Sequence, residues 1–444
     1  MLKTFVSFPI LKGVFTLPII SGFKLAPKQL KILKLLFIYR GMTPEQIVCA
    51  LNPEKYDRLE FMDQKSSGKT PRNNLYSKSL KSMREDYSLI SRIERRTGDV
   101  YFLTKKGYEF MQEYLNIPPG KIGLGYNEDF GYFDYDLYRP PQKQLLHHLS
   151  RVDFFLVLKN IAAKESISVI KHRDNLYSSV KYEDDENNKS RKFMPDGEVM
   201  IGEKKFWIEI DTGTEFADAL TQKFRGYSDY ISYLHKNGQK IADGILFISN
   251  KTESALDKTR SLTIIRSFFS GIGEWDTSVN LIIGSLTDVK NIIMRELRPN
   301  HDYDYLSKIL RHYFQSNRYN GSQLNRKILV SDDIKKYESM FSGTYTPNGR
   351  NVFVFERFEG IETIGLARAF EFNNVVKRTK NINKIIPVFY SFSNRIKSIE
   401  SLFFDNDEKL KFLERGYCLD LKEDIPKWTN IKGEALSNSN NPFI

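Results

Sequence analysis

The stretch FMPDGEVMIGEKKFWIEIDTGTE, residues 193–215, places acids inside two apolar runs that alternate as β-strands do. Residues two apart in a strand share a face. Glu209 and Asp211 therefore share one face of the second run, and its isoleucines lie on the other. If the two runs pair as a hairpin through residues 202–204, Asp196 lies beside both acids. The acids then either occupy a solvated sheet face or hold a metal ion.

Carboxylates held this close repel one another, and a divalent cation removes that cost. Hard oxygen ligands suit Mg²⁺ or Mn²⁺, and such an ion activates water and stabilises the leaving oxygen of a phosphodiester. A helical pattern follows the acids and carries Lys223, a cation suited to phosphate charge. The sequence thus predicts a catalytic site of Asp196, Glu209, Asp211 and Lys223, with the three acids as metal ligands.

Three further side chains lie on the helix expected from Gln142 onward, namely His147, His148 and Asp153. As alternatives, the two histidines reach the acid site from this helix, and Asp153 approaches the metal ion. Paired histidines at a helix start are more often structural, so these residues remain alternatives to the main prediction.

The wider pattern over residues 142–300 is one helix, three strands, then a helix, a strand, a helix and a strand. This αβββαβ order predicts a mixed α/β sheet with a hairpin at one side. The chain of 444 residues is too long for one ordinary core, so we expect a multidomain α/β protein.

Residues 26–116 predict a separate DNA-binding unit. Helical spacing covers residues 27–40, 43–51 and 74–90, and a hairpin signal is centred on residues 97–99. Three helices followed by a two-stranded hairpin and a closing helix is the order of a winged helix-turn-helix.

Cations gather on the two elements that such a fold lays against DNA. Those on or before the third helix are Lys69, Arg72, Lys78, Lys81 and Arg84, and those on the wing are Arg92, Arg95 and Arg96. The formal net charge of +12 also favours a polyanionic partner. The alternative is a solvated basic face on a small helical domain. We predict contact with double-stranded DNA.

The remaining segments carry less information. Residues 117–141 are rich in Pro, Gly, Asp and Tyr and predict a linker or strap. Residues 301–444 predict a small α+β region of unknown role, with helices expected over residues 302–319 and 398–419. Two isolated cysteines suit a reducing cytoplasm. No run of about 18 apolar residues is present, so we expect no membrane span.

Pro195-Asp196, followed about a dozen residues later by an acidic pair at a strand end, resembles the PD-(D/E)xK (restriction-endonuclease-like) nuclease superfamily. That pattern has a lysine two positions after Glu209, where this chain has Asp211. Lys223 is then the candidate for a migrated lysine, and the departure puts ordinary cleavage in doubt.

A narrower resemblance rests on PDG, IEIDTGTE and LTQKFRGYSDY, preceded by QLLHHLSRVDFFLVL. Over residues 26–116 and 142–290 the chain resembles the replication-relaxation family of plasmid proteins, whose relatives include MobC-type relaxases. The resemblance implies recognition of a specific plasmid origin, metal-dependent nicking, and transfer or replication proteins as partners. It also implies that residues 212–215 form the turn behind the metal ligands.

Three functions follow as hypotheses. The first is a metal-dependent DNA nickase or relaxase at a plasmid or mobile-element origin, supporting mobilisation or replication. The second is a non-catalytic origin-binding factor with a degenerate nuclease fold. The third is a transcriptional regulator with a C-terminal sensor domain, for which the sequence gives no ligand-pocket signal.

Overall fold

The structure is a computed structural model of the whole chain. It describes residues 19–20, 22–66, 76–184, 189–249, 258–273, 279–297, 343–345, 351–357, 361–377, 383–391, 408–421 and 427–436. Lys69, Arg72 and a helix expected over residues 302–319 lie outside these ranges. In the described ranges no helix combines the length and the apolar character needed to cross a membrane.

The N-terminal unit has its helices and hairpin in the predicted order. Thr43 caps the second helix, because its hydroxyl accepts the Gln46 amide (3.3 Å) while the Gln46 side chain accepts the Thr43 amide (2.9 Å). A bridge between Met42 and Tyr101 joins the hairpin to the chain before that helix. The elements are β1 (Ile19–Ile20), β2 (Phe23–Lys24), α1 (Pro27–Tyr39), α2 (Pro44–Leu51), α3 (Arg58–Ser66), α4 (Ser77–Glu85), β3 (Ile90–Ile93), β4 (Val100–Leu103) and α5 (Lys105–Tyr114).

Two helix predictions in this unit were wrong in detail. The sequence analysis placed no helix at Arg58–Ser66, yet α3 forms there and buries Phe61. Its contacts with the long helix of the central unit favour a helix where local propensity is weak. The helix expected over residues 74–90 is shorter, because Ser88 adopts a left-handed φ of 56° and turns the chain into β3.

The segment predicted as a linker or strap packs against α1. It contains the short helix α6 (Tyr135–Tyr138). The buried Tyr138 hydroxyl lies 2.9 and 2.8 Å from the carbonyl oxygens of Leu36 and Phe37, and its ring stacks on Tyr108 at 4.1 Å between centroids. These contacts make residues 117–141 a strap that covers the N-terminal unit.

The central sheet has six strands in the order β14-β11-β10-β9-β8-β5. Pairing is antiparallel from β5 to β8 to β9, parallel from β9 to β10 to β11, and antiparallel from β11 to β14. The predicted mixed sheet with a hairpin at one side is therefore present. Its strands are β5 (Ile170–Asp174), β8 (Gly197–Ile201), β9 (Lys204–Asp211), β10 (Gly244–Ser249), β11 (Asn280–Ser285) and β14 (Ile361–Glu362).

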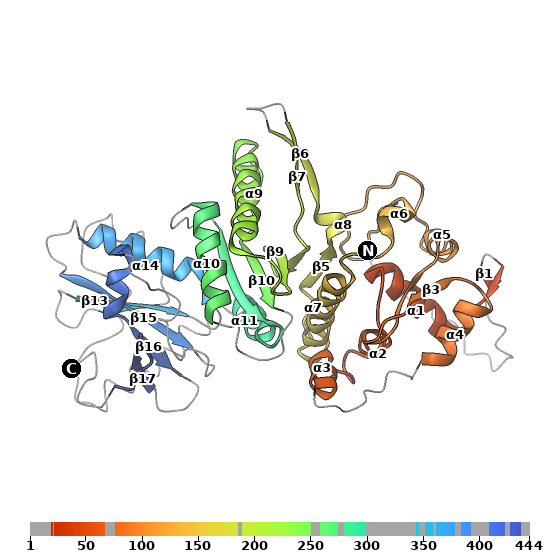
Figure 1. Ribbon diagram of the computed structural model, residues 1–444, viewed down its shortest axis with the longest axis horizontal. Helices are drawn as coiled ribbons and strands as arrows, with labels where there is room; N and C mark the ends of the chain where they lie inside the picture. The colour runs from red at the N-terminus through yellow and green to blue at the C-terminus, as the bar shows by residue number, and fades with distance from the viewer. Residues whose placement is uncertain are drawn as a thin grey trace, which may run out of the picture.

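Helices cover both faces of this sheet, in the arrangement shown in Figure 1. One face packs on α7 (Leu145–Lys164) and α11 (Val289–Leu297), and the other on α9 (Ala217–Lys236) and α10 (Lys258–Ile272). Along β9, Ile208 and Ile210 face α7, and Trp207 faces α9. The far side of α7 packs on the N-terminal unit within the same core, which explains why this helix is buried nearly all round.

The first of the three expected strands was wrong in extent. The run expected as one strand, residues 165–180, contains β5 and the short helix α8 (Asn175–Ser178), and β6 (Val180–Asp184) begins only at its last residue. The strand β6 pairs with β7 (Lys189–Phe193) as a hairpin outside the central sheet. The hairpin lies alongside α9, where Phe193 stacks on Tyr230 with ring centroids 4.1 Å apart (Figure 1).

The C-terminal region contains a five-stranded sheet of order β12-β13-β15-β16-β17. It also contributes β14, which pairs with β11 at the edge of the central sheet. In the described part of the helix expected over residues 398–419, Glu408–Arg415 form a 3₁₀ helix. The prediction was wrong beyond them, because the chain turns at Gly416 into a strand paired with β15. The elements are β12 (Gly343–Tyr345), β13 (Asn351–Arg357), α14 (Thr363–Val376), β15 (Lys384–Ser391), the 3₁₀ helix η4 (Glu408–Arg415), β16 (Tyr417–Asp420) and β17 (Lys427–Asn430).

Candidate functional site

Asp196 directly precedes β8, and Glu209 lies in β9, the strand paired with β8. The pairing begins with Gly197 opposite Ile208, so the two acids lie just at and beyond this end of it. The Asp196 amide donates to the Ile208 carbonyl (2.9 Å), and its Oδ2 accepts the Ile210 amide (2.8 Å). Both of these backbone contacts fix the Asp196 carboxylate at the strand end.

Glu209 is buried, with 3% of its surface exposed, and both of its oxygens have partners. Oε1 accepts the Tyr227 hydroxyl (2.6 Å), and Oε2 accepts Lys223 Nζ (3.1 Å). Burial raises the pKa of Glu209 to about 7, and the nearby Lys223 only partly offsets it. Burial opposes the charge on Lys223, but Glu209 and Glu215 outweigh burial and raise the pKa of this lysine.

Asp211 is clamped by an arginine from α10. Arg260 Nε lies 2.9 Å from Oδ2 and Nη2 lies 2.6 Å from Oδ1, a bidentate pair. The Gly213 amide also donates to Oδ1 (2.9 Å), and Arg260 Nη1 bonds the Glu215 carbonyl. Asp211 shares a strand face with Glu209, but its oxygens are already engaged. Arg260 is not among the predicted site residues.

Of the two histidines considered from sequence, His147 reaches the acids. Its Nε2 lies 3.1 Å from both Asp196 Oδ2 and the Ile210 carbonyl oxygen. Because both neighbours are acceptors, Nε2 carries a proton. The bond to Asp196 raises the pKa of His147. His148 instead lies 3.3 Å from the Gly41 carbonyl, and burial lowers its pKa well below the usual value.

Asp153, the third residue considered on this helix, points away from the acids. Its Oδ1 accepts Arg58 Nε (2.6 Å) and Gln46 Nε2 (2.5 Å), both from the N-terminal unit. The carboxylate of Asp153 therefore joins α7 to α2 and α3. The suggestion that it approaches a metal ion at the acid site was wrong.

Each predicted acid thus has its own cationic or proton-bearing partner: Asp196 with His147, Glu209 with Lys223, and Asp211 with Arg260. In the part of the chain that the structure describes, no three His, Cys, Asp or Glu side chains are grouped as a metal site. The ligand assignment of Asp196, Glu209 and Asp211 stays a prediction.

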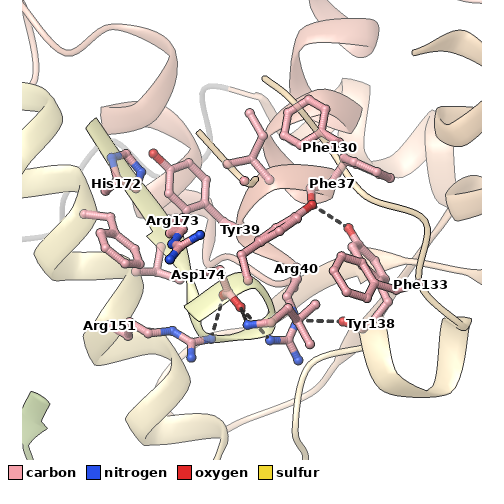
Figure 2. Close-up of a pocket in the computed structure, with 16 residues that line it drawn as sticks. Phe37, Tyr39, Arg40, Phe130, Phe133, Tyr138, Arg151, His172, Arg173 and Asp174 are labelled. Carbon is pink, nitrogen blue, oxygen red and sulfur yellow. Dashed lines mark hydrogen bonds and ion pairs between the residues drawn. The ribbon is translucent and has the colours of Figure 1, made fainter. Parts of the chain in front are cut away.

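A buried ion-pair network runs from Arg151 of α7 through Asp174 to Arg40 of the N-terminal unit (Figure 2). Arg151 Nη1 donates to the Asp196 carbonyl oxygen (3.3 Å), and Nη2 lies 2.9 Å from Asp174 Oδ2. Asp174 Oδ1 accepts Arg40 Nη1 (3.1 Å). Arg40 ends α1 in the left-handed region with φ 67°, and its Nε donates to the Tyr138 carbonyl (2.7 Å).

The sequence analysis missed Arg40, Arg151 and Asp174. A detectable signal was Arg151, a charge in the middle of the apolar helix LLHHLSRVDFFLVL. Such a charge is rarely fully buried without a partner. Its partner Asp174 lies more than twenty residues away, so pairing required the tertiary structure.

The predicted DNA contacts within the described residues lie on α4 and the β3–β4 hairpin. Arg84 pairs with Glu85 (2.6 Å), and Lys81 lies 3.8 Å from the same carboxylate. Arg92 pairs with Glu94 and, at 3.0 Å, with Asp99. The cations without a recorded ion pair among the described residues are Lys78, Arg95 and Arg96.

Comparison with known proteins identifies one family. The model of the replication-relaxation family matches residues 46–245, which run from α2 into β10 and include all four predicted catalytic residues. No curated protein and no solved structure gives a significant match. Residues 46–245, somewhat less than half of the chain, are thus similar to the replication-relaxation family.

Proposed function

We propose that this protein nicks DNA at a plasmid or mobile-element origin in a metal-dependent reaction that supports mobilisation or replication. The observation that carries the proposal is the buried Glu209 carboxylate with Lys223 Nζ 3.1 Å away, in the strand paired with the one that Asp196 precedes. The match of residues 46–245 to the model of the replication-relaxation family supports a role in replication or mobilisation.

The donor types at Asp196 and Glu209 fit a hard divalent cation, because both side chains offer carboxylate oxygens and they belong to neighbouring strands. Arg260 donates hydrogen bonds to both carboxylate oxygens of Asp211. Asp211 can therefore act as a third metal ligand only if its bonds to Arg260 break. A bound Mg²⁺ or Mn²⁺ would supply an activated water and charge stabilisation for the leaving oxygen. Lys223 holds a positive charge beside Glu209, and His147 holds a proton at Nε2 toward Asp196.

Lys223 is proposed to replace the lysine of the PD-(D/E)xK pattern. The position two residues after Glu209 is Asp211, and that side chain binds Arg260. Lys223 comes from α9, the helix after the strand, and contacts the same carboxylate. A lysine supplied by the helix would still place its charge at the acid site, which is what phosphate chemistry requires.

The N-terminal unit is proposed to be a winged helix that binds the origin. Its support is the order of α1, α2, α4 and the β3–β4 hairpin, with the Met42–Tyr101 bridge adding a third short pairing beside the hairpin. The exposed cations of α4 and the hairpin are suited to phosphates.

Among the predicted DNA contacts, those without an ion pair in the described residues are expected to contribute most to DNA binding. They are Lys78, Arg95 and Arg96. Arg96→Ala should weaken duplex binding across all sequences and lower the slope of log K against log salt by about 1. Arg92→Ala is the matched control and should have a smaller effect, because Glu94 and Asp99 already neutralise Arg92. Fluorescence anisotropy over a salt series measures both slopes. An Arg96→Ala slope equal to that of wild type would contradict the winged-helix proposal.

A non-catalytic origin-binding factor is the second candidate. The observation that favours it is the bidentate pair of Asp211 and Arg260. Asp211 stands at the position where the nuclease pattern has its lysine. Such a chain would bind DNA without cutting it.

Plasmid relaxation separates the two candidates. Supercoiled plasmid carrying the native origin is incubated with wild type in Mg²⁺, in Mn²⁺ and in EDTA, with a gel shift run in parallel. We expect nicked circles in one or both metals and none in EDTA. Intact plasmid in every lane, together with a clear gel shift, would reject nicking and leave the origin-binding factor.

A further inference from the structure

One face of the β6–β7 hairpin packs on α9. Tyr182 and Phe193 are buried there, with ring centroids 5.3 and 4.1 Å from that of Tyr230. Arg191, the cross-strand partner of Tyr182, pairs with Asp229 of the same helix. These alternate positions define the inner face of the hairpin, which stands beside α9 as a separate two-stranded sheet (Figure 1).

The outer face of the hairpin carries two lysines at directly opposite positions. Lys181 and Lys192 are cross-strand partners, and each is adjacent in its strand to residues of the inner face. Because successive residues of a strand point to opposite faces, both lysine side chains lie on the side away from α9. Both residues are exposed. The register therefore places two ammonium groups on one surface.

Neither lysine has an ion pair with a carboxylate in the part of the chain that the structure describes. Glu183 and Ser190 are the next pair on the outer face, and Glu183 forms no recorded ion pair with either lysine. Like charges directly opposite each other destabilise a pair of strands. This placement costs stability in the free protein, and an anion bound between the lysines would remove that cost.

The base of the hairpin is fixed to the acid site. The rings of Phe193 and Tyr227 have centroids 4.9 Å apart, and the Tyr227 hydroxyl donates to Glu209 (2.6 Å). Lys192 stands four residues before Asp196, so their Cα atoms are at most about 14 Å apart. Each strand of a DNA duplex carries one phosphate per about 3.4 Å of its axis. A duplex lying at the acid site therefore has phosphates within reach of the lysine pair.

We propose that Lys181 and Lys192 bind the phosphate backbone of origin DNA beside the acid site. The inference rests on the proposed function for the presence of DNA there, and it adds a second contact surface to that of the N-terminal unit. Lysine suits this role because its ammonium group is a compact charge with three donors on a flexible stem. Phosphate contacts carry no sequence information, so the hairpin holds the duplex and leaves sequence recognition to other residues.

The double variant Lys181→Gln with Lys192→Gln tests the inference. Its matched control is Lys164→Gln with Lys290→Gln, which removes the same charge from α7 and α11 on the other face of the central sheet. Each control lysine already pairs with a carboxylate. Fluorescence anisotropy over a salt series, in EDTA, measures binding to an origin duplex and to an unrelated duplex of equal length. Thermal melting without DNA measures the stability of each variant.

We expect the hairpin variant to bind both duplexes more weakly than wild type. The slope of log K against log salt should fall by about 2, one unit for each lost phosphate contact. The control variant should keep the slope of wild type. Without DNA, the hairpin variant should melt at the same temperature as wild type or higher, because the repulsion between the two lysines is gone.

A wild-type salt slope for the hairpin variant would overturn the inference. A lower slope accompanied by a lower melting temperature would also overturn it, because the lysines would then act in folding of the hairpin. Neither result bears on the proposed nicking, which plasmid relaxation tests separately. Conversely, a protein that never nicks, but whose stable hairpin variant loses salt slope, would retain the lysine contact and reject the nickase.

Discussion

Glu209→Gln is expected to reduce origin nicking about 1,000-fold or more while leaving DNA binding intact. One preorganised charge at a reacting centre is typically worth about 100- to 1,000-fold in rate, and Glu209 is both a predicted metal ligand and the anchor of Lys223. The substitution keeps the side-chain shape, and the amide oxygen still accepts the Tyr227 hydroxyl. Single-turnover nicking of an origin plasmid in Mg²⁺ measures the effect.

Glu203→Gln is the matched control for this variant. Glu203 lies in the turn of the same hairpin and is exposed, so the same change in charge there should leave nicking unaltered. Wild-type nicking by Glu209→Gln would remove Glu209 from the reaction and would contradict the proposed site.

Substitutions of Lys223 test the same site independently of Glu209. Lys223→Met keeps the apolar stem and removes the charge, and we expect a loss of about 100-fold in nicking rate. Lys223→Arg should recover part of the rate, because a cation returns beside Glu209 and Glu215. Equal rates for Lys223→Met and wild type would reject its role as the migrated lysine.

Asp174→Ala is expected to lower the free energy of unfolding by about 3–5 kcal/mol, the usual cost of removing one partner from a buried ion pair. The change leaves Arg40 and Arg151 without their shared carboxylate, and both arginines are buried. It also removes the Asp174 side chain that accepts the Leu176 amide (2.9 Å) at the start of α8. Chemical denaturation followed by tryptophan fluorescence measures the loss.

The surface pair of Asp136 and Arg139 provides the control for this prediction. Their charged atoms are 3.7 Å apart, and the Asp136 side chain is 86% exposed, so Asp136→Ala should cost less than about 1 kcal/mol. A similar small cost for Asp174→Ala would show that solvent already screens the Arg40–Asp174–Arg151 network. If that network also positions the acids, Asp174→Asn should slow nicking at a temperature where the variant is fully folded.

Local pattern was enough to predict the hairpin that carries the acids. The alternation of KFWIEID separates its two faces, and Ile201 pairs with Lys204 around a two-residue turn whose Gly202 has φ 62°. The mixed sheet with a hairpin at one side was also predicted, because strands and helices there alternate with clear apolar periods, but its strand order was not.

Side-chain partners were much harder to predict. Asp211 shares a face with Glu209 as expected, yet its partner Arg260 comes from α10, 49 residues further on. His147 and His148 are neighbours in sequence, but a helix turns successive residues by about 100°, so one reaches Asp196 and the other reaches Gly41. Sequence spacing alone gave no means of choosing between them.

The sequence by itself determined the hairpin, the strand face shared by Glu209 and Asp211, and the order of the elements around them, because these depend on the two-residue and 3.6-residue periods of strands and helices. Only the tertiary structure decided which charge each acid meets, that Asp153 binds Arg58 in the N-terminal unit, and that Arg40 reaches Arg151 through Asp174. The reason is physical: a buried charge must find a partner wherever packing brings one, and packing joins residues that are far apart in the chain.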